Sequence, residues 1–136
     1  MLYQAVRNST LARYNTLSTS ESIASSAVKT TIDCGAKAII VCSESGTTAT
    51  QVAKFRPGRP IIVLTPSEQV ARQCCGVLRS VSAKILSSFD QMDSAIESII
   101  SDLKKEGMAH AGDAVVVITG TLNQKGATNL MRVQYA

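Results

Sequence analysis

The sequence predicts an α/β fold, a three-layer sandwich in which a mostly parallel five-stranded sheet has helices on both faces and ends in an antiparallel strand. Short, wholly apolar segments such as Ala38–Cys42 alternate with helix-like segments. Uninterrupted apolar strands are typical of parallel sheets that are buried on both faces. The connections between the first strands each hold a helix, as parallel pairing requires. The last connection, from Ile118 to Asn129, spans only about ten residues. This is too short for a crossover and predicts an antiparallel final pair.

Two helices are expected before the first strand. Residues 2–14 carry apolar side chains at loosely helical spacing and predict a short leading helix. Ser18 and Glu21 have the spacing of a capping box, which predicts the start of a second helix that ends at Gly35. The apolar positions of this second helix are Ile23, Ala24, Ala27, Val28 and Ile32. The segment 38–42 is then the first predicted strand.

The same alternation continues through the middle of the chain. A helix over 47–55 leads into the rigid turn Pro57–Pro60. A buried strand is predicted over 61–64, because all four residues are apolar. A short helix over 68–75 and a weaker strand within 77–86 complete this part.

The sequence of the C-terminal part of the chain predicts one long helix and two strands. The helix covers 90–106 and is stopped by Gly107. Its apolar face consists of Met92, Ile96, Ile99, Ile100 and Leu103. Residues 114–118 form the third strongly apolar strand, and Leu130–Tyr135 is expected to pair with it in the antiparallel sense.

Composition and charge exclude several classes of function. The chain has 136 residues, which suits a single domain over 1–136, and an apolar content of 45% indicates a globular protein. The basic residues behind the net charge of +4 are scattered and Trp is absent, so we expect no nucleic-acid partner. No apolar run reaches the roughly 18 residues of a membrane span, and the first residues lack the apolar region of a signal peptide. We therefore expect a cytoplasmic protein with no membrane partner.

Side chains suited to catalysis or metal binding are scarce. The cysteines, Cys34, Cys42, Cys74 and Cys75, match no zinc or redox spacing. We expect small buried thiols, with an oxidation-sensitive vicinal pair as the alternative. The single histidine, His110, lies in a helix-to-strand connection where we expect it to be solvated. We expect no catalytic residue, no metal site and no cofactor in this chain.

A candidate phosphate-binding loop follows the first predicted strand. Its residues are Ser43, Glu44, Ser45, Gly46, Thr47 and Thr48. A Gly/Ser/Thr turn before a helix presents free backbone N–H groups and the positive end of the helix dipole to an anion, and hydroxyls add donors. Glu44 would have to face away from the ligand or act as a base. No Lys follows the glycine as in a P-loop, which argues against nucleotide hydrolysis.

Three segments are expected to meet at the carboxyl edge of the sheet, where open α/β sheets bind ligands. They are 43–48, 65–67 and 119–129. The last segment is polar, is punctuated by glycine and carries one cation, Lys125. It could close over a phosphosugar, and a hairpin connection without function is the alternative.

Eight short segments of the chain, taken together in their order and spacing, carry a resemblance to a known family. They are Lys37–Val41, Ser45–Thr48, Val52–Pro57, Pro60–Ile62, Ala71–Arg72, Gly112–Asp113, Ile118–Gly120 and Thr128–Val133. Each segment alone is weakly specific, but the ordered set resembles the C-terminal domain of pyruvate kinase over nearly the whole chain.

The resemblance implies a function. The family transfers a phosphoryl group from phosphoenolpyruvate to ADP, giving pyruvate and ATP in glycolysis, with Mg²⁺ and usually K⁺. Its catalytic barrel and lid domain are not in this sequence, so the resemblance implies the allosteric, effector-binding domain, inactive when isolated. The loop matching Ser43–Thr48 would bind a sugar phosphate, and the last strand would contribute to a homotetramer interface. The clamp over the ligand would be formed by Thr121, Asn123, Gln124, Lys125, Gly126, Ala127 and Thr128.

Departures from the family pattern bear on the ligand. Members that bind a bisphosphate use a basic residue at the start of the helix matching 90–106, where this chain has Ala95. The clamp also lacks the family's frequent Trp and its Arg-Pro pair. We therefore favour a monophosphate effector over fructose 1,6-bisphosphate, unless Lys125 or Arg132 supplies the missing charge.

Two alternatives remain open from the sequence. The Ser-x-Ser-Gly-x-Thr pattern within 43–48 also occurs in sugar isomerase domains, which would make the chain a stand-alone phosphosugar-binding protein. A purely structural module that joins subunits and ignores effectors is the second alternative.

Overall fold

The computed structural model describes residues 2–14, 19–42, 47–55, 57–77, 81–85, 92–120 and 128–136. Its elements are α1 Leu2–Tyr14, α2 Thr19–Cys34, β1 Ile39–Cys42, α3 Thr47–Lys54, β2 Ile61–Thr65, α4 Glu68–Val77, β3 Val81–Ile85, α5 Met92–Lys105, β4 Ala114–Gly120 and β5 Thr128–Tyr135. Each expected helix and strand is present, with bounds that differ from the sequence expectation by at most a few residues.

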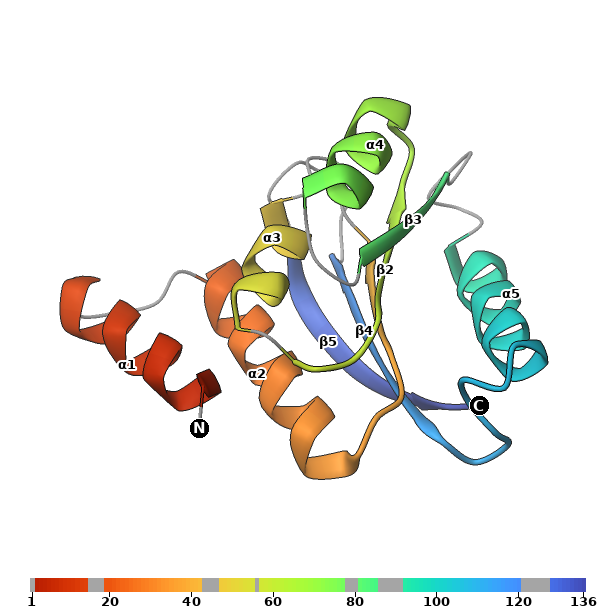
Figure 1. Cartoon of the computed structure of the whole chain (residues 1–136), viewed down its shortest axis with the longest axis horizontal. Helices are drawn as coiled ribbons and strands as arrows, with labels where there is room; N and C mark the ends of the chain where they lie inside the picture. Colours follow the sequence, from red (N-terminus) through yellow and green to blue (C-terminus); the bar gives the residue numbers. More distant parts are fainter. Residues whose placement is uncertain are drawn as a thin grey trace.

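The five strands form one mixed sheet in the order β3-β2-β1-β4-β5 (Figure 1). The first four strands are parallel to one another, and β5 pairs antiparallel with β4. In the central strand, Ile39 pairs with Ile61 of β2 on one side and with Val116 of β4 on the other. The predicted antiparallel ending is therefore confirmed. Beyond the Ala114–Tyr135 pair, two more backbone hydrogen bonds extend the ladder: Gly112 N donates to Ala136 O and Ala136 N donates to Asp113 O, both at 2.8 Å.

Helices cover both faces of the sheet, as the predicted three-layer sandwich requires. Side chains alternate along β1, so that Ile39 and Val41 point to one face and Ile40 and Cys42 point to the other. The first face packs against residues of α1, α2, α3 and α4. The second face packs against α5 alone among the described helices. Figure 1 shows α2 and α3 on one side of the sheet, α5 on the opposite side, and α1 extending away beyond α2.

Glycines end the two long helices at the predicted positions. Gly35 and Gly107 have φ angles of 63° and 76°, a left-handed conformation that glycine adopts without steric cost. After α5, Met108 N donates to Leu103 O at 2.9 Å and Gly107 N donates to Lys104 O at 3.2 Å. These two bonds form a Schellman motif, which satisfies carbonyls that would otherwise lack a partner at the helix end.

Two expectations about α2 are wrong. Ile32, expected on the buried face, has 40% of its side-chain surface exposed, and Cys34, expected to be a buried thiol, is exposed. The inward position in this turn belongs instead to Thr31, which is 2% exposed and donates its hydroxyl to Ala27 O at 2.8 Å. This bond lets a polar side chain occupy the buried stripe, so that Ile32 lies at its border. The capping residue Ser18 lies outside the described residues.

We expect Ile39→Ala to lower the free energy of unfolding by about 2–5 kcal/mol, because it leaves a cavity in the central strand. Ile39 is 0% exposed, and it lies in the larger core cluster. Ile85→Ala on the edge strand β3, where the side chain is 53% exposed, is the matched control and should change stability by about 0.5 kcal/mol or less. Urea unfolding would measure both. Equal losses for the two variants would contradict the assignment of the core.

Candidate functional site

The carboxyl ends of β1, β2 and β4 lie side by side at one edge of the sheet. Cys42, the last residue of β1, pairs with Leu64, one residue before β2 ends. On the other side, Val41 pairs with Ile118, two residues before β4 ends. The connections that leave these three strands therefore start at nearly the same level. This is the edge at which open α/β sheets bind ligands.

Buried threonines mark this edge. The strands themselves are apolar, but Thr65 at the end of β2 and Thr119 near the end of β4 are 0% and 7% exposed. Thr48, in the first turn of α3, is 4% exposed. Short side chains with hydroxyl groups replace Val, Ile and Leu here. This change supplies hydrogen-bonding groups in a partly dehydrated setting.

The segment after β2 uses its hydroxyl groups to start a helix. Thr65 Oγ1 accepts a hydrogen bond from Ser67 N at 3.2 Å, and Ser67 Oγ accepts one from Val70 N at 3.3 Å. Ser67 is thus the N-cap of α4. The predicted convergence of 65–67 on this edge is confirmed, and these two hydroxyls have a structural role there.

The predicted phosphate loop runs into α3. Ser43, Glu44, Ser45 and Gly46 lie outside the described residues. Thr47 and Thr48 are the first two residues of α3, whose first-turn N–H groups and dipole favour an anion at this end.

The predicted clamp joins β4 to β5 at the same edge. Thr121, Asn123, Gln124, Lys125, Gly126 and Ala127 lie outside the described residues. Thr128 is the first residue of β5, and its backbone pairs with that of Gly120 at the end of β4. The two ends of the clamp segment are therefore held next to each other beside the end of β1.

The structure contains an ion pair that the sequence analysis did not predict. Arg132 of β5 and Asp93 in the first turn of α5 form an ion pair, with Nη2 and Oδ1 3.1 Å apart. They also act on Cys42, whose pKa is raised to about 12 mainly by burial, while the charge of Arg132 lowers it and that of Asp93 raises it. The sequence offered Arg132 only as a possible source of charge, since nothing local connects positions 93 and 132.

The first turn of α1 reaches the far end of α3. The hydroxyl oxygens of Tyr3 and Ser25 are 2.7 Å apart in a buried hydrogen bond that joins α1 to α2. The rings of Tyr3 and Phe55 are 5.8 Å apart, and Lys54 Nζ lies 3.9 Å from a carboxylate oxygen of Glu21 in α2. The helix that begins at the candidate site is thus packed at its other end against both N-terminal helices.

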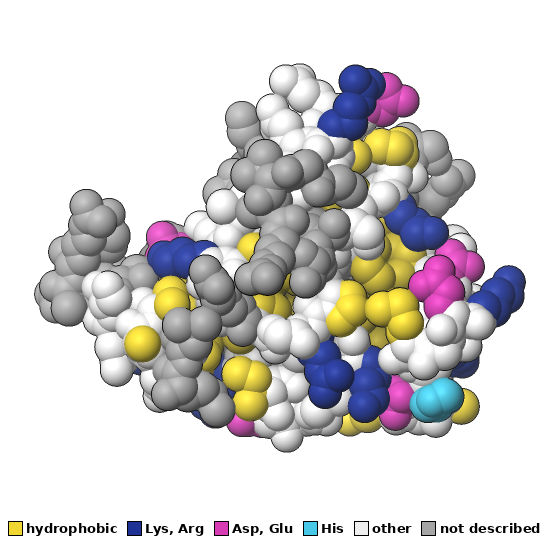
Figure 2. Space-filling model, viewed as in Figure 1, with side chains coloured by type: hydrophobic (Ala, Val, Ile, Leu, Met, Phe, Trp, Pro, Cys, Tyr) yellow, Lys and Arg dark blue, Asp and Glu magenta, His cyan; other side chains and the backbone are white. Residues whose placement is uncertain are grey.

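The described residues also show how charged and potential metal-binding side chains are distributed. On the face shown in Figure 2, the described Lys and Arg side chains are spread over the surface, with two near each other at the lower edge and several beside acidic ones. Within the described ranges, no three His, Cys, Asp or Glu side chains gather as a metal site would require, and His110 is exposed. No described helix is long and apolar enough to cross a membrane.

Comparison with known proteins identifies the family. Residues 21–134 match the family model described as the pyruvate kinase alpha/beta domain. The chain belongs to this family. Pyruvate kinase from Eimeria tenella is 32% identical over 133 residues, which cover 96% of this chain and 25% of that protein. Pyruvate kinase from Clostridium acetobutylicum is 39% identical over 106 residues, covering 75% and 22% of the two chains.

Solved structures agree with this assignment. The crystal structure of a Cryptosporidium parvum pyruvate kinase superposes with a TM-score of 0.86 at 30% identity, covering 98% of this chain and 25% of that one. A Cryptosporidium parvum pyruvate kinase in complex with ADP gives a TM-score of 0.87. The chain spans a quarter or less of the length of these curated relatives. Membership in the pyruvate kinase family argues against the sugar isomerase alternative.

The raised pKa of Cys42 predicts a stability loss at alkaline pH. The folded protein keeps this thiol protonated up to about pH 12, whereas the unfolded chain ionises it near its ordinary value of 9.0. Above pH 9 the folded state therefore binds more protons, and the free energy of unfolding falls as pH rises from 9 to 12. The slope is at most about 1.4 kcal/mol per pH unit.

Urea unfolding between pH 8 and pH 10.5 would measure this contribution. Cys42→Ala should lose less stability over this range than the unsubstituted chain, whereas Cys34→Ala, at an exposed site, is the control. Parallel curves for the chain and Cys42→Ala would show that the thiol ionises equally in both states.

Proposed function

We propose that this chain is the allosteric domain of a pyruvate kinase and binds a sugar phosphate at the carboxyl edge of its sheet. The observation that carries this proposal is the convergence of three strand ends, with buried threonines, beside the first turn of α3. A phosphate needs several donors that converge on one point. The first turn of α3 offers backbone N–H groups, and the hydroxyl groups of the predicted loop Ser43–Thr48 are the proposed O–H donors. The predicted ligand contacts are Ser43–Thr48, and the predicted clamp is Thr121–Thr128.

The parent enzyme, in this proposal, transfers a phosphoryl group from phosphoenolpyruvate to ADP in the cytoplasm as part of glycolysis. The catalytic barrel, the ATP-binding residues, and the Mg²⁺ and K⁺ sites would belong to the remaining three quarters of such an enzyme. The isolated chain is then expected to bind effector without catalysing the reaction.

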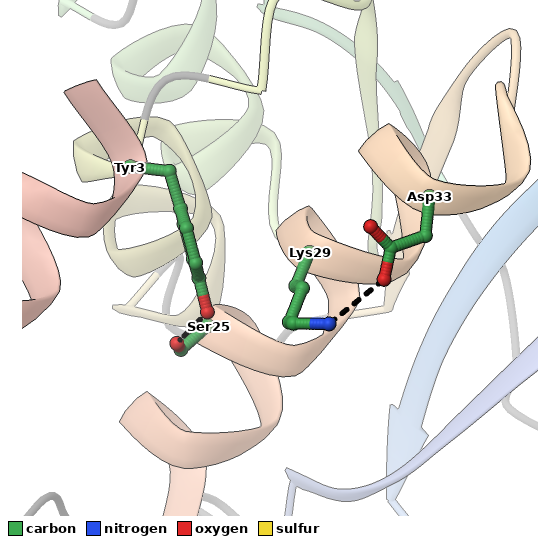
Figure 3. A network of polar contacts seen from close by, with 4 residues as sticks. All are labelled: Tyr3, Ser25, Lys29 and Asp33. Atoms are coloured by element: carbon green, nitrogen blue, oxygen red, sulfur yellow. Dashed lines mark hydrogen bonds and ion pairs between the residues drawn. The ribbon is translucent and has the colours of Figure 1, made fainter. Parts of the chain in front are cut away.

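Effector binding would regulate the enzyme through a coupling free energy between two sites. A ligand that binds the active tetramer more tightly shifts the population toward it, typically by about 1–3 kcal/mol. The route supported by the contacts runs along α3, from Thr48 at the candidate site to Phe55 against Tyr3 of α1. Tyr3 is fixed in turn by its hydrogen bond to Ser25 (Figure 3). A displacement of α3 would therefore be passed to α1.

A role in oligomerisation is supported by the other side of the molecule. β5 is an edge strand whose backbone has one open side, and Tyr135 near its end is 67% exposed. Ile32 of α2, the helix that packs on β5, is 40% exposed. A second copy that covers this edge would bury both side chains. The proposed assembly is a homotetramer in which this edge forms one of the contacts.

Effector binding is tested by thermal unfolding of the chain with glucose 6-phosphate, ribose 5-phosphate, AMP, inorganic phosphate and unphosphorylated glucose. A monophosphate at 100 times its dissociation constant should stabilise the fold by about 2.7 kcal/mol, a shift of several degrees, and glucose should give none. Thr48→Val should weaken the response about ten- to a hundredfold in affinity, because one hydrogen bond to a charged ligand is lost. Ser98→Ala on α5, at an exposed position, is the control. A flat panel for the unsubstituted chain would contradict effector binding.

Oligomerisation is tested by sedimentation of Tyr135→Glu. A buried carboxylate at a subunit contact is costly, so this variant should dissociate at concentrations where the unsubstituted chain associates. Ile85→Glu, on the opposite edge strand β3, is the control and should sediment like the unsubstituted chain. Identical behaviour of the two variants would argue against a contact at β5.

A further inference from the structure

Cations without an ion-pair partner gather at the amino edge of the sheet, the end at which β1, β2 and β4 begin. Some of the Lys and Arg side chains that the structure describes form ion pairs, and these are Lys29, Lys54, Arg72, Lys84 and Arg132. The other described ones, which form no ion pair, are Arg7, Lys37, Arg59, Lys104 and Lys105. All of these except Arg7 lie at the amino edge, at the opposite end of the strands from the candidate effector site.

The pairing of β1 with β2 brings Lys37 next to Arg59. The two strands pair from Ile39 and Ile61 onward, and Ile39 N also donates to Pro60 O at 3.0 Å. Lys37 and Arg59 each stand two residues before these paired positions, so they enter neighbouring strands side by side. Like charges at neighbouring positions repel each other, and this arrangement therefore lowers the stability of the chain by itself.

The end of α5 adds two cations to this edge. Its last turn carries Lys104 and Lys105, which are both exposed. The preceding residue, Leu103, packs in one core cluster with Ala38, which directly follows Lys37. Figure 2 shows two basic side chains near each other at its lower edge, the end at which Figure 1 places the segments leading into β1 and β4. The residues Lys37, Arg59, Lys104 and Lys105 are called the basic edge below.

An exposed apolar side chain lies within this surface. Met108, just after α5, is 42% exposed, whereas the next residue, Ala109, is buried. The described carboxylates here are Glu106, which is exposed, and Asp113, which accepts a hydrogen bond from His110 N at 2.8 Å. A polyphosphate chain would meet these carboxylates as well as the cations. An apolar centre with a charged rim is typical of protein interfaces, in which Met and Arg are enriched.

Tight, hydrogen-bonded turns build this edge. Gly58 and Gly112 have φ angles of 73° and 89°, which let the chain reverse just before β2 and β4. After α2, Ala36 N donates to Thr31 O at 3.0 Å. Turns that are already formed do not have to be ordered when a partner binds, so the entropy cost of binding is low.

We propose that the amino edge of the sheet is a docking surface for an acidic protein segment. Its carboxylates would pair with the basic edge, and an apolar side chain of the segment would contact Met108. Binding would remove the repulsion between Lys37 and Arg59, so these two cations favour binding at the expense of the stability of the free chain. The surface is separate from the candidate effector site and does not depend on effector binding.

The structural alternative is that these cations only offset the negative ends of helix dipoles. Lys104 and Lys105 hold positions in the last turn of α5 where a cation stabilises a helix. Lys37 lies between α2 and β1, outside any helix. Lys37→Gln should therefore raise the Tm by about one to three degrees if repulsion dominates, and lower it if the charge only serves the fold.

The experiment is fluorescence anisotropy with a labelled synthetic peptide that carries Glu residues around a central Leu, and with Gln replacing Glu in the control peptide. The 136-residue chain should bind the Glu peptide at low salt, more weakly at physiological salt, and should not bind the Gln peptide. Lys37→Glu and Lys104→Glu should each weaken binding about three- to tenfold. Arg7→Glu reverses an unpaired charge on α1, away from this edge, and is the matched control. Carbodiimide, which couples carboxylates to nearby amines, should attach the peptide at the lysines of the basic edge.

Each contrary outcome has a distinct meaning. No binding of the Glu peptide, or equal losses in Arg7→Glu and Lys37→Glu, overturns the proposal. Tighter binding of polyphosphate than of the peptide, lost in Lys37→Glu, overturns it in favour of a polyanion site. Self-association of the chain that is lost in Lys37→Glu, without peptide binding, overturns it in favour of a contact between copies. A lower Tm for Lys37→Gln with unchanged peptide affinity overturns it in favour of the structural role.

Discussion

The burial of the central strand β1 is the constraint on which the rest of the structure depends. All four of its residues are buried, so their backbone N–H and C=O groups must be paired by protein. Two parallel neighbours supply this pairing, β2 on one side and β4 on the other. Because alternate side chains point to opposite faces, the same strand requires apolar cover above and below it. Helices α1 to α4 provide this apolar cover on one face, and α5 provides it on the other.

This arrangement also explains why the candidate site lies where it does. β1, β2 and β4 are parallel and end at nearly the same level, so the connections that follow them leave from one edge of the sheet. Inside the sheet, polar atoms other than the backbone would lack partners. At the edge they find some, as when Thr65 accepts a hydrogen bond from Ser67 N. Threonine therefore replaces apolar residues where the strands end, because a hydroxyl group can find a hydrogen-bond partner there.

The parts of the structure that could be predicted from the sequence are those set by local pattern. Apolar runs identified the strands, and Gly107 identified the end of α5, because a left-handed residue is required there. The shortness of the β4–β5 connection was enough to fix the direction of the last strand. Ile32 was misplaced because its neighbour Thr31 satisfies its own hydroxyl within α2 and can take the buried position. The ion pair between Arg132 and Asp93 could not be predicted from the sequence. It depends on the register between β4 and β5 and on the position of the start of α5 relative to these strands.

The order of the strands has a consequence for how the chain acquires its structure. β1 lies between β2, which follows it closely in sequence, and β4, which comes much later. While the chain is being synthesised, β1 can pair with β2 early but keeps an open apolar edge until β4 leaves the ribosome. Such long-range pairing is slow, because the entropy cost of closing a large loop comes before the strands gain any favourable contact. The nascent chain therefore passes through a stage in which a hydrophobic strand edge is uncovered, and this is the stage at which chaperones would be most needed.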